Sequence, residues 1–211
     1  MRQAPFVKIC GITSPEDGRA AAEAGAAAIG LVFWSRSPRA VDLPTARRIT
    51  AGLPPFVLRV GVFVDEQPDV IARISDSVGL DLVQLHGNES PETLAALPRR
   101  ALKAVRVGSD FRPEQALRYS GHAAGLLLDS GDADLPGGTG GVFDWAVVDG
   151  LRDRLGFVVL AGGLTPDNVG LAIRTIRPDA VDVSSGVEAA PGRKDPAKMG
   201  AFVAAVRSAV A

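Results

Sequence analysis

The sequence has a single cysteine, Cys10, and only two histidines, His86 and His122, among its 211 residues. One cysteine excludes an internal disulfide framework and any zinc site built from several cysteines. Two histidines far apart in the chain count against a histidine-based metal site.

The sequence also lacks an excess of charge of either sign, with 23 Lys and Arg against 24 Asp and Glu. No basic surface is therefore expected for nucleic acid or for an anionic membrane. No apolar run reaches the roughly 18–20 residues of a membrane helix, and no signal peptide is recognisable. We expect a cytoplasmic protein that acts on a small molecule. We also expect a monomer rather than a homodimer, because no long exposed apolar patch can be inferred.

Eight short apolar segments recur along the chain at intervals of about 25 residues, the length of one strand, one loop and one helix. They cover residues 6–9, 29–33, 58–64, 82–85, 102–105, 125–128, 157–160 and 180–183. The segments between them carry helix start signals, with a capping residue before a proline in Ser14-Pro15, Ser90-Pro91 and Thr165-Pro166. Helices are expected over 14–24, 166–176 and 196–210. Leu43-Pro44 and Gln67-Pro68 also place proline in a first turn, but without a good cap.

Most of these segments are apolar at consecutive positions, as parallel strands covered on both faces should be. Eight strand–helix units fill a chain of this length, so we predict one domain, residues 1–211, with the (β/α)8 TIM-barrel fold. The alternative is an open doubly wound sheet. That fold usually has five or six strands and a G-x-G-x-x-G motif after the first, where this chain has Cys10-Gly11-Ile12-Thr13. The fold alone does not identify the chemistry.

The carboxyl ends of the last two predicted strands are rich in glycine and serine. Active sites of (β/α)8 barrels form at these strand ends. Glycine lets backbone N–H groups approach an anion closely, and a short helix after the loop would add its dipole. We predict phosphate binding at Gly162, Gly163, Ser185 and Gly186. The alternative is that these glycines only make tight turns.

Alternation along the first and eighth strands places two charged residues inside the barrel. If Val7 and Ile9 face the helices, Lys8 and Cys10 face the barrel axis, and the same rule turns Asp182 inward. A buried lysine without a partner is costly, and the two strands are neighbours in a closed barrel. We therefore predict an ion pair between Lys8 and Asp182 that is more structural than catalytic.

Cys10 and Asp129 form the candidate catalytic pair. Asp129 is a lone carboxyl group after the apolar run Leu126-Leu127-Leu128, and apolar surroundings favour the protonated form that a general acid needs. A thiol can act as a base if nearby positive charge stabilises its thiolate. The alternative for Cys10 is a small buried apolar residue. The two groups are expected to face each other across the barrel mouth, with room between them for a sugar.

Other polar residues are expected at the same rim. Arg39 or Arg36 could recognise a carboxylate through its planar guanidinium, although both could instead be solvated surface residues. Gln84 and His86 are candidates for lining the pocket, and a structural histidine is the alternative. The glycine-rich segment 137–141 is interpreted as a mobile lid or as a loose connection.

Seven segments in order along the chain together resemble one family, phosphoribosylanthranilate isomerase of tryptophan biosynthesis. They span nearly the whole chain and comprise residues 7–13, 37–39, 83–87, 127–129, 137–145 with the glycine run and Phe143-Asp144-Trp145, 161–164 and 181–188.

The resemblance implies an Amadori rearrangement without a cofactor, with N-(5-phosphoribosyl)anthranilate as substrate. It implies that Asp129 is the general acid that opens the sugar ring and that Cys10 is the general base that removes the proton from sugar carbon 2. Arg39 would hold the anthranilate carboxylate, and the strand-7 and strand-8 loops would hold the phosphate. Asp182 would also contact sugar hydroxyls.

Three other functions remain open on the sequence. An indoleglycerol-phosphate synthase would need a catalytic lysine at a strand end, and a ribulose-phosphate epimerase would need metal-binding histidines, which this chain hardly has. A non-enzymatic sensor of phosphorylated metabolites would keep the phosphate loops but would need neither Cys10 nor Asp129.

Overall fold

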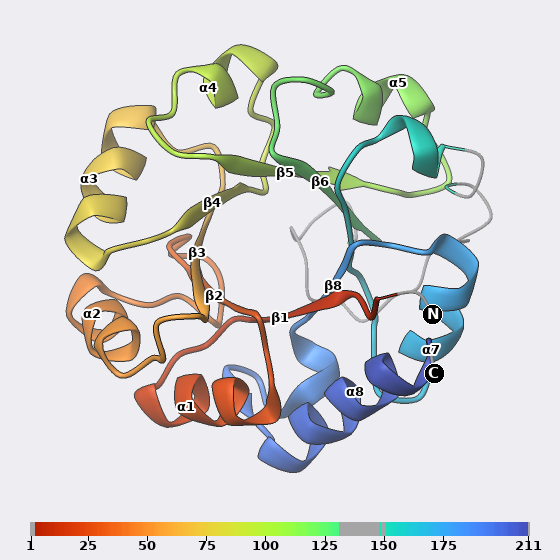
Figure 1. The fold of residues 1–211 in the computed structure, drawn as a ribbon. Helices are drawn as coiled ribbons and strands as arrows, with labels where there is room; N and C mark the ends of the chain where they lie inside the picture. Colours follow the sequence, from red (N-terminus) through yellow and green to blue (C-terminus); the bar gives the residue numbers. More distant parts are fainter. Residues whose placement is uncertain (1–2, 131–147, 149–150, 211) are drawn as a thin grey trace.

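Eight parallel strands close into a barrel in chain order, and helices surround it (Figure 1). The computed structural model describes residues 3–130, 148 and 151–210. The strands are β1 (Phe6–Cys10), β2 (Ala28–Val32), β3 (Leu58–Phe63), β4 (Leu82–Leu85), β5 (Ala101–Arg106), β6 (Gly125–Asp129), β7 (Val158–Leu160) and β8 (Ala180–Val183). The predicted (β/α)8 fold is confirmed, and each predicted strand lies within one or two residues of an observed one.

The outer layer consists of helices that each follow a strand. They are α1 (Pro15–Ala24), α2 (Leu43–Ala51), α3 (Pro68–Val78), α4 (Pro91–Ala95), α5 (Pro113–Leu117), α7 (Val169–Ile176) and α8 (Pro196–Ser208). Short 3₁₀ helices cover η1 (Arg152–Arg154) and η2 (Ser185–Val187), and the strands β9 (Glu188–Ala190) and β10 (Arg193–Lys194) pair as a hairpin before α8. None of the described helices has the length and apolar character required to cross a bilayer.

The helix start signals are confirmed at α1 and α4, where the Ser14 and Ser90 hydroxyls accept hydrogen bonds from the Asp17 and Thr93 N–H groups. They are wrong in part at two other helices. Helix α2 does have a good cap, because the Asp42 carboxylate accepts from the Thr45 N–H at 2.8 Å. Helix α7 begins at Val169 rather than Pro166. The Asn168 side chain there accepts from the Thr165 N–H and donates to the Gly163 carbonyl, and these bonds hold the preceding residues in a turn.

Alternation along the strands separates two apolar layers, as predicted. Val7 and Ile9 of β1 pack outward in the large core between strands and helices. A smaller cluster fills the barrel interior and consists of Leu102, Ala104, Leu127, Val159, Ala161 and Ala180. Lys8 and Asp182 face inward and pair there. Since the interior is packed in this way, a ligand can enter only at the ends of the barrel.

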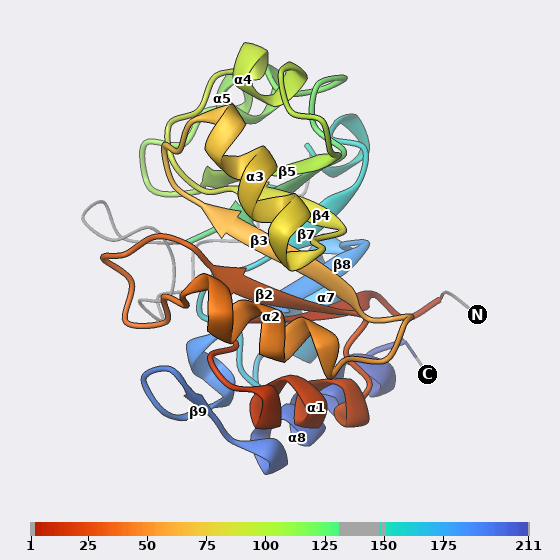
Figure 2. The same cartoon turned by 90° about the vertical axis from the view of Figure 1, so that its left-hand side faces the viewer.

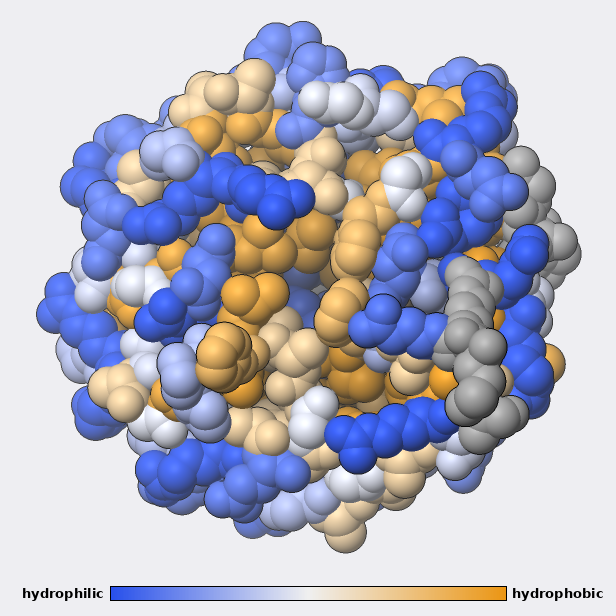
Figure 3. Space-filling model, in the orientation of Figure 1, coloured by the Kyte–Doolittle hydropathy of each residue, from blue (hydrophilic) through white to orange (hydrophobic). Residues whose placement is uncertain are grey.

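The amino-terminal end of the barrel exposes apolar side chains around a hollow (Figure 3). Phe56 is 94% exposed, and Phe6, Leu58 and Phe157 are also exposed at its border. An exposed apolar patch, which could not be inferred from the sequence, therefore exists at this face. The sequence does not reveal the patch because its members come from separate strand ends and loops, which only the closed barrel brings together.

Candidate active site

A pocket at the carboxyl ends of the strands contains the predicted site residues, with the exception of Gly186. It is lined by Cys10, Arg39, Gln84, His86, Asp129, Gly162, Gly163, Asp182 and Ser185, together with neighbours that include Trp34 and Ser184. Figure 2 shows this end of the barrel at its left, with the connection from β2 to α2 and with β9, while the two termini lie at the opposite end. The closed barrel thus gathers residues from six strands into one pocket.

Cys10 is the last residue of β1, and its side chain points into the barrel beside Gly30 of β2. A Cβ atom at Gly30 would lie 2.6 Å from the Cys10 Sγ, so only glycine at this position leaves room for the sulfur. Burial raises the pKa of the Cys10 thiol above its ordinary value, while the positive charges of Lys8 and Lys194 act in the opposite direction.

Lys8 and Asp182 form the predicted ion pair beneath the pocket. The Lys8 Nζ donates to the Asp182 Oδ2 at 2.7 Å, and both side chains are more than nine-tenths buried. Burial by itself lowers the pKa of Lys8, but the charges of Asp182 and Cys10 outweigh burial and raise it. The second oxygen of Asp182, Oδ1, has no hydrogen-bond partner among the described residues, and Asp182 lines the pocket.

Asp129 ends β6 and contacts His86, so its surroundings are less apolar than the sequence predicts. The His86 Nε2 lies 3.1 Å from the Asp129 Oδ2, and the Gln84 Nε2 lies 2.9 Å from the His86 Nδ1. Since the Gln84 amide nitrogen can only donate, Nδ1 is the acceptor and the proton of a neutral ring is on Nε2. With this tautomer, His86 donates to the Oδ2 of the Asp129 carboxyl group, and Gln84 sets the tautomer.

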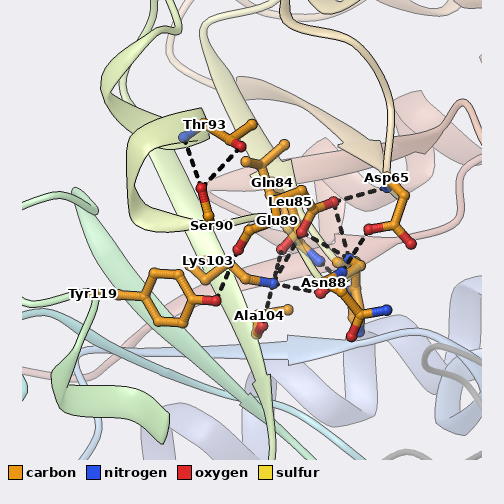
Figure 4. Close-up of polar contacts among 12 residues, drawn as sticks. Asp65, Gln84, Leu85, Asn88, Glu89, Ser90, Thr93, Lys103, Ala104 and Tyr119 are labelled. Carbon is orange, nitrogen blue, oxygen red and sulfur yellow. Dashed lines mark hydrogen bonds and ion pairs between the residues drawn. The ribbon is translucent and has the colours of Figure 1, made fainter.

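A second buried ion pair, between Lys103 of β5 and Glu89, lies outside the barrel beside the turn that follows β4 (Figure 4). The Lys103 Nζ lies 3.0 Å from the Glu89 Oε2 and donates to the Gly87 carbonyl at 2.7 Å. The Glu89 carboxylate accepts from the backbone N–H groups of Gly87 and Asp65. Gly87 is therefore held at both its N–H and its carbonyl, which fixes the backbone next to His86. Neither Lys103 nor Glu89 was a candidate site residue from the sequence.

Arg39 does not present a free guanidinium, because a carboxylate of the protein already occupies one edge. Its Nε and Nη2 each donate to Glu188 at 2.8 Å, and Lys194 donates to the same carboxylate at 2.9 Å. Burial raises the pKa of Glu188, but the hydrogen bonds from Arg39 and Lys194 outweigh it and hold the pKa below its usual value. Neither Lys194 nor Glu188 was given a role from the sequence, because the hairpin that carries them shows no recognisable motif.

Arg36, the alternative to Arg39, is exposed on the same loop. Its guanidinium carbon lies 5.3 Å from the centroid of the Trp34 ring, in a cation–π arrangement. Trp34 lines the pocket but Arg36 does not. The geometry thus favours Arg39 as the arginine within reach of a bound carboxylate.

The loops after β7 and β8 meet at the position of Gly186. A Cβ atom there would lie 1.9 Å from the Leu164 carbonyl oxygen, so the glycine allows the two loops to touch. Gly186 is therefore a packing residue of this loop pair, while Gly162, Gly163 and Ser185 border the pocket itself. The short helix expected after the eighth strand is η2. The glycine-rich segment 137–141, interpreted as a lid or a loose connection, lies outside the described residues.

Comparison with known proteins identifies similar chains over nearly the whole length. The family model of N-(5'-phosphoribosyl)anthranilate (PRA) isomerase matches residues 7–205. An N-(5'-phosphoribosyl)anthranilate isomerase of Pseudomonas aeruginosa (strain LESB58) is 54% identical over 204 residues, which are 96% of this chain and 95% of the relative. The crystal structure of phosphoribosyl anthranilate isomerase from Thermotoga maritima has a TM-score of 0.91 at 44% identity, over 97% of this chain and 99% of that one. A further structure, with a TM-score of 0.88 at 43% identity and the same coverage, shows such an isomerase in complex with reduced 1-(o-carboxyphenylamino)-1-deoxyribulose 5-phosphate.

Proposed function

The chain belongs to the N-(5'-phosphoribosyl)anthranilate isomerase family, and we propose that its Cys10 and Asp129 carry out the proton transfers of that reaction. The protein is an isomerase of tryptophan biosynthesis. It converts N-(5-phosphoribosyl)anthranilate to 1-(2-carboxyphenylamino)-1-deoxy-D-ribulose 5-phosphate by an Amadori rearrangement with general acid–base catalysis. The family membership rules out the synthase, epimerase and sensor functions considered above.

Asp129 is the general acid. Protonation of the ring oxygen by its carboxyl group breaks the bond between that oxygen and sugar carbon 1, and the nitrogen lone pair forms a Schiff base at carbon 1. Cys10, as a thiolate, then removes the proton from carbon 2. The electron pair of that C–H bond forms a C=C bond between carbons 1 and 2, and the nitrogen is neutralised. The resulting enolamine tautomerises to the ketone, so no atom is gained or lost overall.

One observation carries this assignment: Cys10 and Asp129, which are 119 positions apart in the sequence, line the same pocket at the barrel mouth. They come from β1 and β6, on different sides of the ring of strands. A sugar bound between them would present its ring oxygen to one group and its carbon 2 to the other. General acid–base catalysis needs each group close to its own substrate atom, which this arrangement supplies.

The remaining pocket residues bind the substrate. Arg39 contacts the anthranilate carboxylate through the donors that Glu188 does not use. The Asp182 Oδ1, which has no partner among the described residues, accepts a hydrogen bond from a sugar hydroxyl. Gln84 and His86 complete the wall beside Asp129. Gly162, Gly163 and Ser185 bind the phosphate through backbone N–H groups, and Gly186 keeps the loops in place.

Three further assignments are proposals as well. Residues 1–211 form one domain, for which a single cooperative unfolding transition is expected. The protein resides in the cytoplasm, which cell fractionation would test. The monomer predicted from the sequence stays a prediction: a related isomerase from T. maritima is described as dimeric, and the exposed apolar end of the barrel counts against a monomer. Sedimentation velocity at micromolar concentration measures the oligomeric state.

The assay for the function follows anthranilate fluorescence after fresh substrate is mixed with the protein. Substrate and product have the same mass, so the product is identified by the ¹³C NMR signal of its ketone carbon. We expect the fluorescence to decay and the ketone signal to appear only with protein present. An absence of ketone under conditions where the reduced product still binds would show that the pocket is not catalytic.

A further inference from the structure

A buried thiol is a poor base unless something stabilises its negative charge. Cys10 lies within the barrel mouth, and burial raises its pKa. The thiolate, rather than the thiol, removes a proton, so the proposed base needs a positive charge close to its sulfur. In the described part of the chain, three cations lie near Cys10: Lys8, Lys194 and Arg39. Their hydrogen-bond partners show which of them can stabilise the thiolate.

Lys194 and Arg39 are held by other partners. The Lys194 Nζ, on β10, donates to Glu188 and to the Ser184 carbonyl. Arg39, on the loop after β2, donates twice to Glu188. The negative charge of Glu188 thus lies between both cations and weakens their effect on the sulfur. The other titratable groups near Cys10 in the described part of the chain are Asp182 of β8 and, across the pocket, Asp129 of β6 with His86, which follows β4.

Among these cations, Lys8 is the nearest to Cys10 in the sequence. The two side chains lie on the same side of β1. Lys8 and Cys10 are two positions apart on β1, so both point into the barrel. Both side chains converge on Gly30, where a Cβ atom would lie 2.6 Å from the Cys10 Sγ and 3.1 Å from the Lys8 Nζ. The ammonium and the sulfur therefore border the same small space above one glycine. The bond to Asp182 uses one of the three N–H groups of Lys8 and leaves others for the sulfur.

We propose that Lys8 is the positioning residue of the general base: its ammonium, held by Asp182, stabilises the thiolate form of Cys10. Asp182 anchors Lys8 but also opposes it, because its own negative charge disfavours a thiolate nearby. The Lys8–Asp182 pair, predicted to be mainly structural, thereby acts on catalysis through Cys10. The inference rests on the proposed role of Cys10 as the base.

The test measures the thiolate directly, as the pH dependence of the rate of alkylation by iodoacetamide. Cys10 is the only cysteine in the sequence, so the rate reports this sulfur alone. In Lys8→Met we expect the midpoint of the alkylation profile to rise by about one pH unit, a tenfold loss of thiolate at a pH below the midpoint. Lys8→Arg retains the charge and should keep the midpoint within a few tenths of a unit.

The direction in which the alkylation midpoint moves distinguishes stabilisation of the thiolate by Lys8 from a loosened fold. If the substitution only loosened the barrel, the sulfur would become more exposed and its midpoint would fall, since burial raises it. Lys8→Met leaves Asp182 buried without a partner and could unfold the protein, so Lys8→Met/Asp182→Asn is the second variant. The double variant should have a midpoint between those of the wild type and Lys8→Met. A midpoint that is unchanged or lower in both variants would overturn the inference.

Comparison of Lys8→Met with Cys10→Ala shows whether the role of Lys8 or the proposed role of Cys10 as the base has failed. The acidic limb of the kcat/KM profile should move upward with the alkylation midpoint in Lys8→Met. If Cys10→Ala keeps near-normal turnover while the alkylation midpoint still rises in Lys8→Met, the role of Cys10 as base is wrong and the effect of Lys8 stands. If Cys10→Ala is inactive and the midpoint does not move, the inference about Lys8 is wrong.

Discussion

The guanidinium of Arg39 donates two parallel hydrogen bonds of 2.8 Å to the carboxylate of Glu188, from Nε to Oε1 and from Nη2 to Oε2. This bidentate contact joins the loop after β2 to the hairpin after β8. It holds the arginine in one orientation, so that the anthranilate carboxylate proposed to bind here would meet a donor already in place. Pre-ordering of this kind reduces the entropy that binding would otherwise cost.

The first prediction compares Arg39 with Arg36 on the same loop. Removal of a hydrogen bond to a charged group typically costs about 1.5–3 kcal/mol, so Arg39→Gln should raise KM for the native substrate by roughly ten- to hundredfold. For an analogue without the carboxylate, KM should change much less. Arg36→Gln is the matched control, because Arg36 stacks on Trp34 but does not line the pocket itself, and this variant should not discriminate between the two substrates. Equal losses with both substrates in Arg39→Gln would remove the carboxylate contact from the proposal.

The second prediction concerns the catalytic pair. General acids and bases typically contribute about 10²–10⁴-fold, so Cys10→Ala and Asp129→Asn should each lower kcat by that factor. Binding of the reduced product should change little, because the proposal assigns the contacts to the carboxylate and to the phosphate to other residues. Steady-state kinetics measures the loss of kcat, and calorimetry with the reduced product measures whether binding is unchanged. Near-normal kcat in either variant would exclude that residue from its role.

The third prediction tests whether His86 acts through Asp129. The imidazole lies 3.1 Å from the Oδ2 of the Asp129 carboxyl group, and residues that work as a unit show non-additive losses. His86→Ala should lower kcat by about tenfold alone, and Asp129→Asn/His86→Ala should be no slower than Asp129→Asn. A double variant that is slower by the product of the two single losses would instead mean that His86 acts on the substrate independently.

The fourth prediction uses two glycines in opposite settings. A Cβ atom at Gly186 would meet the Leu164 carbonyl, so Gly186→Ala should destabilise the protein by about 1–3 kcal/mol and raise KM through the displaced phosphate loops. At Gly200, within α8, a Cβ atom meets nothing within 4 Å, and Gly200→Ala should stabilise the protein by up to about 1 kcal/mol. Chemical denaturation of both variants measures the difference. A neutral Gly186→Ala would show that the two loops can separate freely.

Local patterns predicted the strands well and the helix starts less well. Apolar runs determine which segments are buried, so all eight strands are identifiable without any tertiary information. Helix α7 was predicted three residues too early because the Thr165-Pro166 signal is local, whereas Asn168 bonds back to Gly163 in the preceding loop. The exposed apolar end of the barrel was missed because Phe6, Phe56 and Phe157 become neighbours only after the ring closes.

The sequence by itself determined the barrel, the inward direction of Lys8 and Cys10, and the pairing of Lys8 with Asp182, because a two-residue period and the cost of burying a lone charge leave few alternatives. Only the tertiary structure decided that Glu188 occupies one edge of Arg39 and that His86 contacts Asp129. It alone also placed the Lys8 ammonium and the Cys10 sulfur beside the same glycine of β2. These relationships join residues on different strands and loops. Their distances depend on how the ring closes, and no periodicity in the chain encodes that closure.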